Sequence, residues 1–148
     1  MDSDLTDIVL RLLAAAGIGL LMGLERLLKR KPVGMRTLGL VSFVAALVTL
    51  SLTHADGILG NPEGLGRVLQ GAVQGVLVGV GFLGGGVILR DTSGVHNLTT
   101  AAEVWVAAGI GLAAAVAPWS LVGVGAVVFV LLIVVFRVLE QKFHLKGH

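Results

Sequence analysis

Residues 68–89 read VLQGAVQGVLVGVGFLGGGVIL and contain no charged side chain. As a helix this run would rise about 33 Å, enough to cross the hydrocarbon core of a bilayer, which is about 30 Å thick. Further apolar runs flank it on both sides, so the sequence predicts an all-α polytopic membrane protein. We expect one transmembrane domain over residues 1–148, a bundle of about five glycine-rich helices that span the membrane at residues 5–28, 37–53, 68–89, 98–117 and 119–139.

The composition excludes an ordinary soluble domain. Charged residues make up 14% of the chain and hydrophobic residues 55%, whereas a soluble domain averages about 25% charged residues. So few charges could not cover the surface of a water-soluble globule. The chain also lacks cysteine, which excludes disulfides, thiolate metal sites and a cysteine nucleophile.

Lysine and arginine predict the orientation of the spans. The connector between the first two spans holds Lys29, Arg30, Lys31 and Arg36, and such basic connectors stay in the cytoplasm. Alternation then places the N-terminus outside and the C-terminus inside. The N-terminus is acidic, unlike the basic start of a signal peptide, so we expect the first apolar run to be retained. The pattern fits the inner membrane of a bacterium.

Small residues recur at intervals of four in two spans. Gly19 and Gly23 have this spacing in the first span, and Gly71, Gly75 and Gly79 have it in the third. Four-residue spacing places small residues on one helical face, where they let two helix backbones approach closely. The pattern predicts helix packing, within the chain or in a homo-oligomer. A thin-walled pathway or a hinge is the functional alternative.

Ionisable and polar residues gather near one predicted membrane face. Glu103 is the deepest, about 9 Å beyond Asn97 along a helix. A carboxylate at that depth needs a partner, and the available cations are Arg26, Arg36 and Arg90. We hypothesise that Glu25, Arg36, Arg90, Asp91 and Glu103 converge there. One interpretation is a set of interfacial ion pairs; the other is a polar site for ions, protons or a partner, formed by Glu25, Arg26, Arg36, Arg90, Asp91, His96, Asn97 and Glu103.

Two local motifs have simple structural explanations. Asn97 precedes the fourth span, and its side chain is expected to accept a hydrogen bond from the amide of Thr100 as a helix cap. Residues 79–84, GVGFLG, match the dinucleotide-binding pattern. That pattern requires a strand before it and a helix opening at it, whereas these glycines lie late inside a predicted span. We therefore expect no nucleotide site.

Three signatures in order resemble those of a known family. They are GLER at 23–26 with KPVGMRT at 31–37, then GFLGGGVILR at 81–90, then LTTAA at 98–102 with Trp105 and GIG at 109–111. Together they are similar to the MgtC/SapB family of bacterial inner-membrane proteins, and the likeness covers about residues 17–111. Many members carry a soluble C-terminal domain, and we expect this chain to correspond to the transmembrane domain only.

The resemblance implies a role in adaptation to low magnesium or to acid stress. We expect a regulator that acts through other membrane proteins, such as the ATP synthase, and that has no enzymatic activity. The alternative is a small oligomeric transporter or channel for Mg²⁺ or protons that uses the carboxylates near the cytoplasmic face. The sequence predicts no catalytic residue, no cofactor, no bound metal and no nucleic-acid partner; the expected surroundings are the lipid bilayer.

Overall fold

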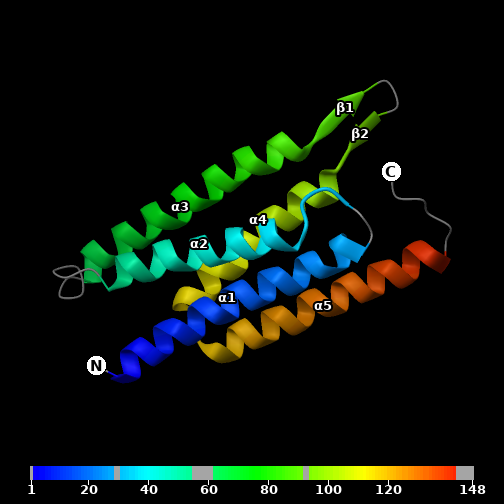
Figure 1. Cartoon of the computed structure of the whole chain (residues 1–148). Coiled ribbons are helices and arrows are strands. Elements are labelled where there is room, and N and C mark those ends of the chain that lie inside the picture. The colour runs from blue at the N-terminus through cyan, green and yellow to red at the C-terminus, as the bar shows by residue number, and fades with distance from the viewer. Residues whose placement is uncertain (1, 29–30, 55–61, 92–93, 143–148) are drawn as a thin grey trace.

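The structure, a computed structural model, describes residues 2–28, 31–54, 62–91 and 94–142. These residues form five helices and a short two-stranded antiparallel sheet (Figure 1). The elements are α1 (Asp2–Leu28), α2 (Met35–Thr53), α3 (Pro62–Val87), β1 (Leu89–Asp91), β2 (Gly94–His96), α4 (Leu98–Val116) and α5 (Trp119–Lys142).

The helices confirm the polytopic all-α class. Within the described residues, four stretches are long and apolar enough to cross a membrane: Leu5–Leu24, Met35–Thr53, Glu63–Val87 and Leu98–Val116. In α5 the apolar stretch is the shorter Trp119–Phe129. Such helices suit a bilayer because every backbone polar group in their interior is satisfied within the segment itself.

The helix boundaries differ from the expected spans by a few residues, and two of the differences have a clear local cause. The third helix begins at Pro62 rather than residue 68, because proline is favoured in the first turn, where its missing N–H would be unpaired in any case. Between the expected third and fourth spans, where no strand was expected, the structure has two short antiparallel strands, in which Leu89 pairs with His96 and Asp91 with Gly94. Gly94 has a φ of 138°, a conformation that glycine adopts without steric penalty.

The first, second and fourth helices form the tightly packed part of the bundle. A Cβ added at Gly19 would lie 2.6 Å from the Leu38 oxygen, and one at Gly23 would collide with the backbone of Met35. A Cβ at Gly111 would collide with the Ser42 carbonyl oxygen. Glycine is therefore what allows α1 and α4 to approach α2 this closely.

The three glycines spaced by four in α3 have different surroundings. A Cβ at Gly71, Gly75 or Gly79 would meet open space, so this face packs against no other described helix of the same chain. Packing against a second chain stays a prediction. One end of α3 leads into the hairpin, which Figure 1 shows at the same end of the bundle as the end of α1 and the start of α2.

Candidate functional site

Arg26 is the centre of a polar cluster at that end of the bundle. Its side chain lies in the last turn of α1 and is only 3% exposed. The guanidinium Nε donates to the Val33 carbonyl oxygen at 3.0 Å, and Nη2 donates to the Pro32 carbonyl oxygen at 3.1 Å. Nη2 also donates to Oγ1 of Thr100, a residue of α4. One side chain thereby joins α1, the connector to α2, and α4.

The partner of Glu103 is Arg26. Arg26 Nη1 lies 2.6 Å from Glu103 Oε1, and the Glu103 side chain is 28% exposed. The contact is a close ion pair without hydrogen-bond alignment. Thr100 and Glu103 are three residues apart on α4, so both lie on the helical face that meets Arg26. Breaking a buried pair by removing one partner typically costs about 3–5 kcal/mol.

Arg26 also holds a strained connector in place. Val33 has a φ of 60°, which is an outlier for a β-branched residue and costs about 1–3 kcal/mol. The carbonyl groups of Pro32 and Val33 both accept hydrogen bonds from Arg26. The α2 helix then begins without a side-chain cap at Gly34. Arg26 therefore fixes the point at which the chain turns from α1 into α2.

The structure brings together only part of the predicted polar cluster. Arg36 is exposed in the first turn of α2 and is not the partner of Glu103. His96 is half-buried at the end of β2. The side chains of three predicted members lie outside those that the structure describes: Glu25, Arg90 and Asp91. Sequence reasoning missed Thr100, although its three-residue spacing from Glu103 on a helix could have indicated it.

The expected side-chain cap at Asn97 was wrong. Asn97 stands at the cap position, with φ 65° and ψ 20°, and makes no side-chain cap hydrogen bond. A capping side chain requires the extended backbone conformation, which the left-handed conformation of Asn97 excludes. Its Nδ2 instead donates to the Val87 carbonyl oxygen at 3.2 Å. Asn97 thus ties the start of α4 to the end of α3 and closes the base of the hairpin.

A second polar cluster lies at the other end of α1, and sequence reasoning missed it. Arg11 Nε is 2.6 Å from Asp7 Oδ2, and Arg11 Nη1 donates to the carbonyl oxygens of Ala114 and Ala117 at 2.9 and 3.0 Å. The guanidinium also lies over the Trp119 ring, 5.1 Å from its centroid. Arg11 therefore satisfies carbonyl groups at the C-terminus of α4 that no helical N–H can reach.

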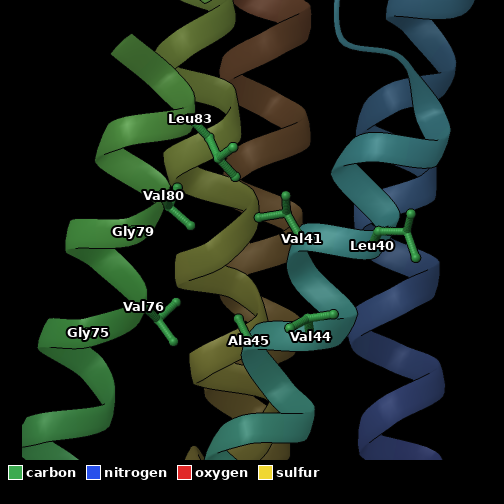
Figure 2. A pocket seen from close by; sticks show the side chains of 9 residues that line it. All are labelled: Leu40, Val41, Val44, Ala45, Gly75, Val76, Gly79, Val80 and Leu83. Atoms are coloured by element: carbon green, nitrogen blue, oxygen red, sulfur yellow. The ribbon is translucent and has the colours of Figure 1, made fainter. Parts of the chain in front are cut away.

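The described residues offer little for metal or covalent chemistry. No group of three or more His, Asp or Glu side chains among them is placed to hold a metal ion. An apolar groove of about 330 Å³ separates α2 from α3. Figure 2 shows Val76, Val80 and Leu83 on the α3 side of the groove and Val41 and Val44 on the α2 side. The polar clusters are thus suited to joining helices, and the groove to binding hydrocarbon.

Comparison with known proteins gives consistent matches. Residues 12–142 match the model of the MgtC family. The chain is 41% identical over 104 residues to protein MgtC of Salmonella typhimurium, across 70% of this chain and 41% of the relative. It is 38% identical over 111 residues to protein SapB of Bacillus subtilis, across 72% of this chain and 47% of the relative. It is 35% identical over 148 residues to protein SrpB of Synechococcus elongatus, across 95% of this chain and 80% of the relative.

The chain therefore spans less than half the length of the Salmonella and Bacillus relatives. No solved structure matches it.

Proposed function

Because the chain belongs to the MgtC family, we propose that it is a membrane regulator that acts by binding another integral membrane protein. The protein acts in the inner membrane of a bacterium during adaptation to low magnesium or to acid stress. It works as a homo-oligomer. The observation that carries this proposal is the Arg26–Glu103 ion pair. The deepest carboxylate of the predicted polar cluster is already neutralised by a buried arginine instead of being left open as an ion ligand.

The packing of the helices supports the same function. The close approach of α1 and α4 to α2 at Gly19, Gly23 and Gly111 leaves no space for a pathway at those contacts. The groove between α2 and α3 is lined by hydrocarbon and glycine, which cannot replace the hydration shell of an ion. A protein with these features suits a binding role better than conduction through a single chain.

The ATP synthase is the partner that the resemblance implies, and its proton pumping offers a direct test. Inverted membrane vesicles would be prepared with equal synthase content, with and without this protein, and ATP-driven acidification would be followed with a pH-sensitive dye. We expect slower acidification in vesicles that contain the protein. Equal rates across a wide range of protein levels would reject this partner.

A small oligomeric transporter or channel for Mg²⁺ or protons is the second candidate. It is favoured by the partial exposure of Glu103, whose side chain is 28% accessible despite its ion pair. Purified protein in liposomes would be assayed for Mg²⁺ and proton flux, with Glu103→Gln as the matched variant. Flux that saturates with substrate and disappears in the variant would establish transport and displace the regulator proposal.

A further inference from the structure

The apolar groove between α2 and α3 begins, on α2, four residues after the exposed Arg36. Leu40, Val41, Val44 and Ala45 line it from α2, and Gly75, Val76, Gly79, Val80 and Leu83 line it from α3 (Figure 2). We propose that this groove holds one acyl chain of an anionic phospholipid whose phosphate is bound by Arg36. This binding site is independent of the regulator or transporter function proposed above.

Helical spacing places Arg36 at the mouth of the groove. Arg36, Leu40 and Val44 follow one another at intervals of four along α2, so they lie on one helical face. At 1.5 Å per residue, Arg36 is about 6 Å from Leu40 along the helix axis. Leu40 and Val44 line the groove, so the same helical face changes from apolar side chains to a cation within about one turn.

The charge at the mouth is available for a lipid headgroup. Arg36 and Lys31 are both exposed, and in the described part of the chain neither one is paired with a carboxylate. Arginine presents a rigid fork of donors that matches the oxygen atoms of a phosphate. Basic residues beside a membrane span are attracted to anionic lipids, each contributing a modest and salt-dependent part of the binding.

The apolar lining of the groove, together with the nearby exposed arginine, favours a lipid chain over a helix of a second copy. The lining positions Gly75 to Leu83 cover about 12 Å of helix, and the volume is about 330 Å³. A flexible hydrocarbon chain needs no polar partner and fits a lining that offers none. Selectivity must then come from the headgroup, which is where Arg36 lies.

Native mass spectrometry of the purified full chain in detergent tests this site. The protein would be incubated with equal amounts of phosphatidylglycerol and phosphatidylcholine that carry identical acyl chains, and the retained lipid would be counted. The groove variant is Gly79→Leu, which fills the groove from a position where the added side chain has open space. Its control is Gly81→Leu, also open but outside the groove. The headgroup variant is Arg36→Gln, with Arg67→Gln near the opposite end of α3 as its control.

We expect the wild type to retain phosphatidylglycerol in preference to phosphatidylcholine. Arg36→Gln should reduce that preference about five-fold, the effect of one arginine at an anionic surface, and Arg36→Lys should restore only part of it, because lysine keeps the charge but lacks the guanidinium fork. Gly79→Leu should reduce retention of both lipids. The two control variants should behave like the wild type.

Three results would overturn the proposal. One is a wild type that retains both lipids equally, and another is an unchanged preference in Arg36→Gln. The third is a folded Gly79→Leu variant that keeps its lipid but loses an oligomeric state of the wild type, because a second copy would then occupy the groove. If Gly79→Leu does not yield folded protein, the lipid preference of Arg36→Gln alone tests whether Arg36 binds the headgroup.

Discussion

Removing the Arg26 guanidinium tests whether the buried ion pair holds the first connector against α4. Arg26→Leu retains an apolar side chain at the end of α1 but removes the ion pair with Glu103. It also removes the hydrogen bonds to the carbonyl oxygens of Pro32 and Val33. The strained backbone at Val33 would then lose the contacts that hold it.

The expected loss of stability follows from these contacts. Leaving one member of a buried pair unpaired costs about 3–5 kcal/mol, and the lower end applies here because the Glu103 side chain is 28% exposed and partly screened. Two carbonyl groups without donors add about 1 kcal/mol. We expect Arg26→Leu to lower the free energy of unfolding by about 4 kcal/mol. Glu103→Gln, which keeps an oxygen for Arg26, should lower it by about 2 kcal/mol.

Equilibrium unfolding in detergent micelles, followed by far-UV circular dichroism, would measure both effects. Arg36→Gln is the matched control, since Arg36 is exposed in the first turn of α2, and it should change stability by less than about 0.5 kcal/mol. In the double variant Arg26→Leu/Glu103→Gln, the loss should fall short of the sum by at least about 1 kcal/mol. An Arg26→Leu protein as stable as the control, or strictly additive losses, would refute the reasoning.

Three further predictions concern packing, capping and topology. Gly23→Leu should lower the free energy of unfolding by about 3 kcal/mol or prevent folding, because a Cβ collides with Met35, whereas Gly81→Leu should be neutral in the same unfolding assay. Arg11→Leu should lower the free energy of unfolding in detergent by about 1–3 kcal/mol, because the carbonyl groups of Ala114 and Ala117 lose their donor; an unchanged unfolding curve would contradict this. Reporter fusions should place the N-terminus outside and the C-terminus inside, and termini on the same side would disprove the orientation derived from the basic connector.

The fold class could be predicted from the sequence because only helices and closed β-barrels can span a bilayer. An uncharged run such as residues 68–89 has no alternative to a helix in an all-α membrane protein. The break between the last two helices was also predictable, because Pro118 has no backbone N–H to donate to a helical hydrogen bond. In the structure α4 ends at Val116 and α5 begins at Trp119. The hairpin was missed because three-residue strands show no measurable alternation of polar and apolar residues.

The candidate site was only partly accessible, because its contacts depend on how the helices are rotated about their axes. The sequence identified Glu103 as a carboxylate that needs a cation, with three arginines as candidate partners. That Arg26 is the partner depends on which face of α1 meets α4. Arg11 pairs with Asp7 at a four-residue spacing that the sequence shows, but its contacts with α4 are to backbone carbonyl groups more than a hundred residues away. Such contacts leave no pattern in the sequence, because every residue carries the same carbonyl group.

The two arginine clusters join α1 to α4 near both ends of the tightly packed part of the bundle, which α1, α2 and α4 form. Both arginines belong to α1, and both reach α4: Arg26 contacts the side chains of Thr100 and Glu103, and Arg11 contacts main-chain oxygens near the other end. Helices in a membrane gain little from the hydrophobic effect on association, so hydrogen bonds and close backbone contact must hold them together. A guanidinium group suits this purpose because it stays charged and has several donors in fixed directions. An added Cβ at Gly71, Gly75 or Gly79 of α3 would meet open space, so this face of α3 lacks the close backbone contact of the other glycines and offers room for a lipid chain or for a helix of a partner.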